Sequence, residues 1–301
     1  PGGMLRRTPE RYDATEEFLA GLPVIVTSHR GSSAFTISPS SGPEAAVIES
    51  MRYDNEHIHP YSYEADVADG QIHVKFAPSE QSAIYELDFL EGSQPSVSLR
   101  SRNGSAHPTG EGFGGEQILN DKVKVYMYME TDVKPVSATP LSDRGNASSL
   151  RLVFPKGTMS VSIRYGVSFI SEEQARLNLL REQEGFDLTG LTDKARRIWN
   201  ETLGKIKVHG GTEDERTVFY TSFYRILERP VRISEDGKYF SASDGKVHDD
   251  GGHPFYTDDW IWDTYRAAHP LRALLFPETE EDIIRSYLLM AEQTGEYWLP
   301  T

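Results

Sequence analysis

The hydrophobic pattern of this 301-residue chain changes its period at Ser171. Before that residue, apolar and polar side chains alternate in short runs, as in strands that bury one face. Gly, Pro, Asn and Ser separate the runs and favour tight turns. The clearest runs are LPVIVTSH, AFTIS, QIHVKFA, AIYELDFL, SVSLRS, KVKVYMYME, LRLVF and MSVSIRYGVSFI. Many short strands joined by turns predict an antiparallel β-sandwich.

After Ser171 the apolar residues recur at helical spacing. The pairs Ser171–Gln174 and Thr212–Glu215 have the spacing of capping boxes, which mark helix starts. Helices are predicted over 171–185, 192–204, 212–228 and 279–294. In the last of these, the side chains expected to face inwards are Ile283, Ile284, Tyr287, Leu288 and Ala291.

These patterns divide the chain into a β-sandwich domain (1–170), a linker helix (171–187) and a helical domain (188–301). A chain of this length is sufficient for two domains. The opening PGGMLRRTPERYD lacks the apolar core of a signal peptide, and the last residues directly follow a helix. We therefore expect the sandwich to be incomplete at its N-terminal side and the helical domain to be truncated at its C-terminal side.

Composition excludes several classes of function. The chain has 46 acidic and 31 basic residues and a net charge of −15, which disfavours nucleic acid as a partner. No apolar run has the length of a membrane helix. Because there is no cysteine, disulfides, zinc–thiolate sites and thiol nucleophiles are excluded. No Ser-His-Asp arrangement, phosphate-binding loop or HExxH motif is recognisable.

The stretch TDDWIWDT, residues 257–264, places three carboxylates and two tryptophans within eight positions. Thr257 is a good N-cap, so we predict a helix from Thr257 to about Ala268. On such a helix Asp259, Asp263 and Arg266 share one face.

Two interpretations of this stretch remain open on spacing alone. In the structural one, the first aspartates cap the helix, Asp263 pairs with Arg266 and the tryptophans fill a core. In the functional one, Asp263 accepts sugar hydroxyls and Trp262 offers an apolar face to the C–H groups of a pyranose, while Arg266 orients the carboxylate.

Other polar motifs favour structural interpretations. GFGGE at 112–116 lacks the GxGxxG frame and is interpreted as a turn between strands. The Asp-Gly pairs at 236, 244 and 250 indicate hairpin turns rather than a calcium loop. The histidines at 248 and 253 are attributed to loop polarity, and those at 57 and 59 to a surface loop.

The segments FYTSFYRILERP and SEDGKYFSASDGKVHDDGGHPFYTDDWIWDTYRAAHPLRALLFPE resemble the glycoside hydrolase family 92 α-mannosidases. WDTYRAAHPL is the most specific piece, and the resemblance is good over about 165–301. It implies an N-terminal β-sandwich, a helical linker and an (α/α)6 toroid, of which this chain would hold the first helices. It also implies a calcium-dependent, inverting exo-enzyme that removes terminal α-linked mannose, often α-1,2-linked, from glycans.

The resemblance also implies site residues. Trp262 and Asp263 match the pair that holds mannose in the −1 subsite, and Asp259 and Arg266 are further candidates for substrate binding. The catalytic acid, the base and the main calcium ligands are expected beyond Thr301, in the remainder of the catalytic domain. The family favours a secreted or periplasmic location. The alternatives are a mannoside-binding protein without catalysis, or another (α/α)6 glycosidase or phosphorylase.

Overall fold

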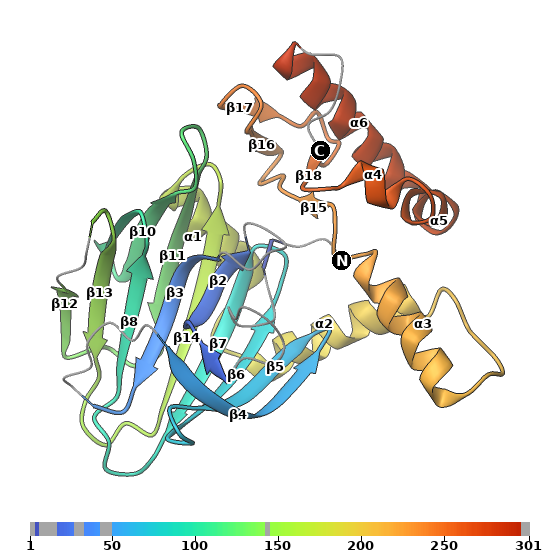
Figure 1. Cartoon of the computed structure of the whole chain (residues 1–301). Coiled ribbons are helices and arrows are strands. Elements are labelled where there is room, and N and C mark those ends of the chain that lie inside the picture. The colour runs from blue at the N-terminus through green and yellow to red at the C-terminus, as the bar shows by residue number, and fades with distance from the viewer. Residues whose placement is uncertain (1–3, 6–16, 27–32, 43–49, 142–144, 296–301) are drawn as a thin grey trace. The chain divides into compact units, whose positions relative to one another are not determined.

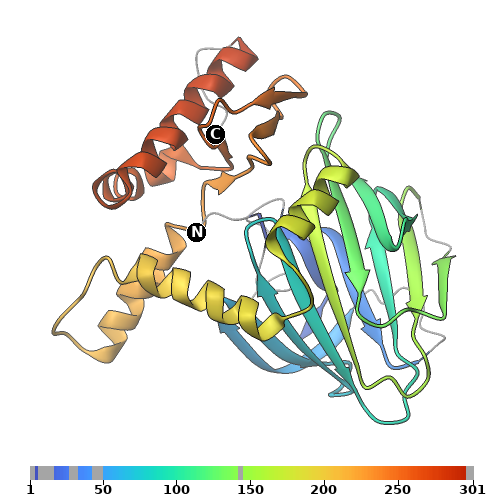
Figure 2. The ribbon, with the colours of Figure 1, turned by 180° about the vertical axis from the view of Figure 1, so that it is seen from behind.

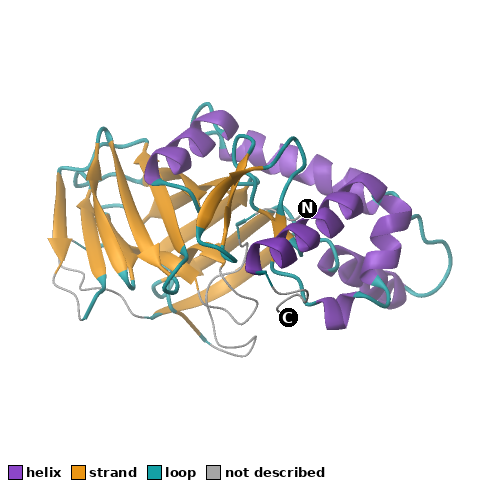
Figure 3. Ribbon diagram, turned by 90° about the horizontal axis from the view of Figure 1, so that it is seen from above, coloured by secondary structure: helices purple, strands orange, loops and turns teal. Residues whose placement is uncertain are grey.

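The residues before 171 form strands β1 to β14 of the computed structural model, and the alternating runs account for eight of them (Figure 1). The structure describes residues 4–5, 17–26, 33–42, 50–141 and 145–295. It divides into two units, residues 5–195 and residues 196–301 with 1–4, and the boundary falls within helix α2 (Leu188–Leu203). Figure 3 distinguishes the strands of the first unit from the helices that dominate the second.

Two antiparallel sheets build the first unit. The larger sheet has the order β1-β4-β5-β6-β7-β14-β11-β10-β9. Its strands are β1 (Phe18–Leu19), β4 (Met51–His59), β5 (Ser62–Val67), β6 (Ile72–Pro78), β7 (Ser82–Phe89), β9 (Gly104–Thr109), β10 (Gly112–Ile118), β11 (Lys124–Thr131) and β14 (Ser160–Ser168). The smaller sheet, in the order β12-β13-β8-β3-β2, has β2 (Leu22–Val26), β3 (Ser33–Ser40), β8 (Ser96–Ser101), β12 (Ser137–Leu141) and β13 (Ser148–Val153).

The core lies between these sheets, and buried polar contacts join them. The amide side chain of Gln117 on β10 accepts a hydrogen bond of 3.1 Å from the backbone N–H of Phe35 on β3. The hydroxyl of Tyr165 on β14 donates to the carbonyl of Val24 on β2 at 3.0 Å. Each contact satisfies a backbone group that the sandwich removes from water. The predicted antiparallel sandwich is confirmed.

Helix α1 (Glu172–Glu182) covers the outer face of the larger sheet, against β14 and β11 (Figure 2). The Ser171 hydroxyl accepts from the Gln174 N–H, as the predicted cap requires. Gly166 on β14 permits this close packing, because a Cβ there would lie 2.2 Å from the carbonyl oxygen of Ala175. The segment predicted as a linker helix is thus packed on the sandwich.

Six strands of the sandwich were not predicted from the sequence: β1, β4, β5, β9, β10 and β12. The prediction of a turn at GFGGE is wrong, since these residues pair with β9 and β11 as β10. A side chain at Gly115 would meet the Ser105 carbonyl at 2.2 Å, so glycine here serves close strand packing rather than a turn. The histidines at 57 and 59 likewise lie on a strand, β4, rather than in a loop.

The second unit consists of the end of α2, four further helices and two small hairpins. The helices are α3 (Glu213–Arg225), α4 (Ile261–Thr264), α5 (Ala268–Leu275) and α6 (Pro277–Thr294). The hairpin strands are β15 (Val231–Arg232) with β18 (Tyr256–Thr257), and β16 (Lys238–Ser241) with β17 (Lys246–Asp249). The change from strands to helices near Ser171 therefore follows the predicted order.

Two sequence signals for helix ends are accurate in this unit. Thr212 and Glu215 form both hydrogen bonds of the predicted capping box at α3. Gly295 ends α6 with a positive φ of 69°, which glycine adopts without strain. The Asp244-Gly245 pair joins β16 to β17 as a tight hairpin, as predicted.

Candidate functional site

The stretch TDDWIWDT does not form the predicted long helix. Thr257 belongs to β18, and Asp258 has a positive φ of 65°, which separates the strand from α4. The Asp258 carboxylate pairs with Arg229, and this contact holds the unusual backbone in place. After one turn, α4 ends at Thr264, and a new helix begins at Ala268. The prediction that Asp259, Asp263 and Arg266 share one helix face is therefore wrong.

Pro270 does not end a helix. It lies in the first turn of α5, where a backbone N–H has no partner within the helix and proline is tolerated.

Asp259 organises the short helix α4. One carboxylate oxygen, Oδ1, accepts from the backbone N–H of Trp260 at 2.9 Å. The other, Oδ2, accepts from the Thr264 hydroxyl at 3.2 Å and from the Tyr287 hydroxyl at 2.5 Å. The side chain of Asp259 is only 1% exposed. Its carboxylate therefore connects both ends of α4 to helix α6.

His269 lies between two carboxylates. Its Nε2 is 2.9 Å from Oδ2 of Asp259, and its Nδ1 is 2.5 Å from Oε1 of Glu280. Arg272 donates from Nε to the other oxygen of Glu280 at 3.1 Å. Two acids thus face two bases in a site where the Glu280 and Arg272 side chains are 5% and 3% exposed. We call Asp259, His269, Arg272, Glu280 and Tyr287 the buried network.

Arg272 also ties the network to the segment after α3. Its Nη1 donates to the carbonyl oxygens of Ile226 at 2.9 Å and Arg229 at 2.7 Å. The planar guanidinium has enough donors for these carbonyls and the Glu280 carboxylate together. Because Arg229 also pairs with Asp258, both sides of the 258–264 segment are anchored to the same cluster.

The buried network shifts the ionisation of its members. Asp259 first and Glu280 second raise the pKa of His269 to about 9. Burial opposes the charge on Asp259, but hydrogen bonds from His269 and Tyr287 and the charge of Arg272 outweigh it and lower its pKa. Burial, together with the bond to Asp259, raises the pKa of Tyr287 well above its usual value. These contacts therefore favour the charged forms of Asp259 and His269 and the neutral form of Tyr287.

Trp262 and Asp263 lie on the outside of the turn that the network holds. Trp262 is 57% exposed, and Asp263 is also exposed. The ring of Trp262 lies 5.6 Å from that of the half-buried Trp260, tilted by 38°. The structural interpretation in which both tryptophans fill a core is therefore wrong for Trp262. An exposed indole beside an exposed carboxylate presents both chemical features that a pyranose requires.

Arg266 contacts its neighbour Tyr265. Its Nε donates to the Tyr265 hydroxyl at 2.8 Å, and its guanidinium carbon lies 5.6 Å from the centre of that ring. Tyr265 is 52% exposed and extends the aromatic surface next to Trp262. In the described part of the chain, no ion pair joins Arg266 to Asp263.

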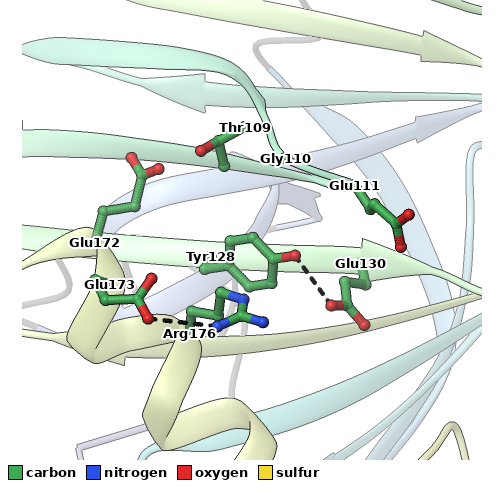
Figure 4. A pocket seen from close by; sticks show the side chains of 8 residues that line it. All are labelled: Thr109, Gly110, Glu111, Tyr128, Glu130, Glu172, Glu173 and Arg176. Atoms are coloured by element: carbon green, nitrogen blue, oxygen red, sulfur yellow. Dashed lines mark hydrogen bonds and ion pairs between the residues drawn. The ribbon is translucent and has the colours of Figure 1, made fainter.

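The first unit has a pocket of about 430 Å³ between α1 and strands β9 to β11 (Figure 4). Its lining residues are Thr109, Gly110, Glu111, Tyr128, Glu130, Glu172, Glu173 and Arg176. Three of its four acids already face bases: Glu130 pairs with Arg164, Glu173 with Arg176 and Glu172 with His107. These contacts are those of a charged surface where α1 packs on the sheet.

Among the described residues, no group of three or more His, Asp or Glu side chains is arranged to hold a metal ion. His248 contacts Asp244, and His253 contacts Asp282 on α6. These are two separate pairs, and His248 lies on strand β17 rather than in a loop.

Sequence analysis did not select His269, Arg272, Glu280 or Tyr287. The spacing of His269 and Arg272 on α5 gave one signal, because residues three apart share a helix face. Their partners lie on α4 and α6, and the sequence gives no sign of that pairing.

The network and its exposed Trp-Asp pair lie within a segment that matches a known family. Residues 174–301 match the model of the glycosyl hydrolase family 92 catalytic domain. This segment is therefore similar to the family 92 catalytic domain. The WDTYRAAHPL motif, which carried the resemblance in the sequence, lies inside the matched family 92 segment.

Solved family 92 structures share the fold of nearly the whole chain. The inverting mannosidase of Bacteroides thetaiotaomicron VPI-5482 superimposes with a TM-score of 0.85 at 26% identity, over 94% of this chain and 42% of its own. An α-mannosidase of Bacteroides thetaiotaomicron gives 0.85 at 21% identity, over 98% and 46%. That enzyme has also been solved with mannoimidazole. The chain thus spans less than half the length of these family 92 relatives.

No curated protein sequence matches the chain. In the part of the chain that the structure describes, no helix has both the length and the apolar character of a membrane span.

Proposed function

We propose that this chain is part of a glycoside hydrolase that removes a terminal α-linked mannose, with α-1,2 linkages preferred. The observation that carries the proposal is the exposed Trp262–Asp263 pair inside the segment that matches the catalytic domain. The names of the similar solved enzymes, an inverting mannosidase and an α-mannosidase, support the same substrate class.

In this proposal, the Trp262 ring packs against the C–H groups of mannose and Asp263 accepts hydrogen bonds from two of its hydroxyls. These contacts place the sugar for attack but do not transfer protons. Arg266, whose guanidinium contacts Tyr265, is kept as a further candidate for substrate binding. Holding the sugar in a reactive orientation lowers the activation free energy, since orientation can account for a large part of catalysis.

Inversion requires one carboxylic acid that protonates the leaving oxygen and one carboxylate that activates water, about 6.5–9.5 Å apart. We assign neither role to a residue of this chain. The proposal places both groups in the remainder of the catalytic domain, which the similar enzymes contain and this chain does not span.

Calcium belongs to the proposal only through the family resemblance. The described residues offer no cluster of oxygen ligands of the kind that calcium needs. Any calcium site would therefore take its main ligands from other parts of the protein. We derive no catalytic step through the ion.

The test uses the whole protein and α-1,2-mannobiose. We expect proton NMR to show β-mannose as the first product, since inversion converts the α linkage to the β anomer. Hydrolysis should not require inorganic phosphate, and EGTA should reduce it. Turnover only with phosphate would indicate a phosphorylase, and binding without turnover would indicate a non-catalytic mannoside-binding protein. Either result would contradict the proposal.

A further inference from the structure

The buried network supports the Trp262–Asp263 turn and does not face the sugar. Both oxygens of Asp259 have partners within the protein, and its side chain is 1% exposed. Asp263, four residues later, is exposed. The two carboxylates of the same short segment therefore have opposite environments.

We propose that Asp259, held by His269 and Tyr287, is a positioning residue that fixes α4 so that Trp262 and Asp263 are presented to the substrate. This inference rests on the proposed function for the identity of the sugar. It replaces direct substrate binding as the role of Asp259.

The geometry gives the physical reason. A four-residue helix is unstable by itself, because it closes few backbone hydrogen bonds for the residues that it orders. Asp259 supplies the missing contacts by accepting from the N–H of Trp260 and from the Thr264 hydroxyl. The Tyr287 hydroxyl and His269 hold the Asp259 carboxylate against α6 and α5. Loss of this carboxylate would free α4 at both ends.

Charge balance gives a second reason. Around His269, Asp259 and Glu280 carry negative charges, Arg272 carries a positive charge, and Tyr287 is neutral. The cluster is neutral only when His269 is doubly protonated. A neutral His269 leaves two buried carboxylates facing one guanidinium, which is costly in a site that excludes water.

The experiment compares Asp259→Asn, Tyr287→Phe and His269→Gln in the whole protein, with Arg285→Gln as the matched control. Arg285 is 44% exposed on α6 and pairs with the exposed Glu281, outside the network. The first measurement is hydrogen–deuterium exchange of the peptide that covers 258–266. We expect Asp259→Asn and His269→Gln to increase exchange there at least about fivefold, and Tyr287→Phe to increase it less. Arg285→Gln should leave it unchanged.

The second measurement is a double-mutant cycle on kcat/KM for α-1,2-mannobiose. If Asp259 acts only through the presented pair, Asp259→Asn should add little to the loss caused by Asp263→Ala. A direct sugar contact or a general loss of folded protein would make the two losses multiply. Multiplied losses would therefore overturn the proposal, as would unchanged exchange at 258–266 in Asp259→Asn.

The two measurements separate this inference from the proposed function. A whole protein without activity on α-mannosides, but with increased exchange in the variants, would contradict the function and keep the positioning role of Asp259 in α4. An active enzyme whose variants show unchanged exchange would support the function and contradict the positioning role of Asp259. If Asp259→Asn fails to fold, Tyr287→Phe tests the same connection by removing a single hydroxyl, and unchanged exchange in that variant would overturn the proposal.

Discussion

Nε2 of His269 lies 2.9 Å from Oδ2 of Asp259, so a histidine on α5 contacts the carboxylate that connects both ends of α4. This contact connects the ionisation of a buried base to the geometry of an exposed Trp-Asp pair. It also makes the helical unit sensitive to pH in a direction that can be worked out.

The stability of the helical unit should fall as pH rises towards 9. The pKa of His269 is raised from 6.5 to about 9 by its carboxylate partners. Its contribution to folding is therefore complete below pH 6.5, decreases between 6.5 and 9, and is lost above 9. Urea unfolding of wild type and His269→Gln should differ most at pH 6 and least at pH 9.5.

Tryptophan fluorescence can report this unfolding selectively, because all four tryptophans, at positions 199, 260, 262 and 298, follow the sandwich in the sequence. A difference between the two proteins that is constant over this pH range would contradict the predicted charge on His269.

Removal of the Asp263 carboxylate should impair turnover without impairing folding. In the whole enzyme, we expect Asp263→Ala to lose at least about tenfold in kcat/KM, or about 1.4 kcal/mol of transition-state stabilisation. Glu281→Ala is the matched control, since Glu281 is an acid with a 70% exposed side chain on α6. Near-normal kinetics of Asp263→Ala, with a normal melting temperature, would remove Asp263 from the sugar site.

Arg272 should not tolerate lysine. Its guanidinium donates to Glu280 and to the carbonyls of Ile226 and Arg229, whereas an ammonium group cannot reproduce this fork. We expect Arg272→Lys to destabilise the helical unit by about 3 kcal/mol, since it leaves buried polar groups without partners. The control Arg285→Lys, at an exposed ion pair, should change the free energy of unfolding by less than about 0.5 kcal/mol. If urea unfolding shows the same loss of unfolding free energy for Arg272→Lys and Arg285→Lys, the contacts of Arg272 do not stabilise the unit in this way.

Gly166→Ala should loosen α1 from the larger sheet. The added Cβ would lie 2.2 Å from the Ala175 carbonyl oxygen and 2.8 Å from the Leu179 nitrogen. Such overpacking costs about 1–3 kcal/mol, which thermal unfolding followed by circular dichroism would detect. Gly185→Ala is the control, because its Cβ would have no neighbour within 4 Å. Equal melting temperatures of the two variants would contradict the packing of α1 on Gly166.

The alternation of apolar residues was sufficient to predict the sandwich, but only for strands with a clear buried face. β14 alternates clearly and was predicted. β4 is mostly exposed and rich in charged residues, and β10 begins with three glycines in four positions, so neither shows the pattern. These strands form because they pair with neighbouring strands, and the residues of those neighbours lie elsewhere in the sequence.

Spacing left the role of Trp262 and Asp263 open, and the resemblance to family 92 indicated them as a sugar-binding pair. The structure places both on the surface. The predicted inner face of α6 is wrong in part, since Ile284 and Leu288 are 50% and 62% exposed while Glu280 is 4% exposed. Hydropathy places a glutamate outside a helix bundle. Only its contacts with His269 and Arg272 explain its burial, and these depend on how α5 and α6 pack.

The contacts that shape α4 all come from residues made later in synthesis or held by them. Tyr287 follows Asp259 by 28 residues, and Arg272 bonds to a carbonyl 46 residues before it. At about 5–20 residues per second, Asp259 would wait roughly 1–6 s on the ribosome before Tyr287 is added. During that interval the segment that carries Trp262 and Asp263 has been synthesised, but the Tyr287 contact that fixes its conformation has not yet formed. The surface that carries Trp262 and Asp263 would therefore be among the last parts of this unit to form.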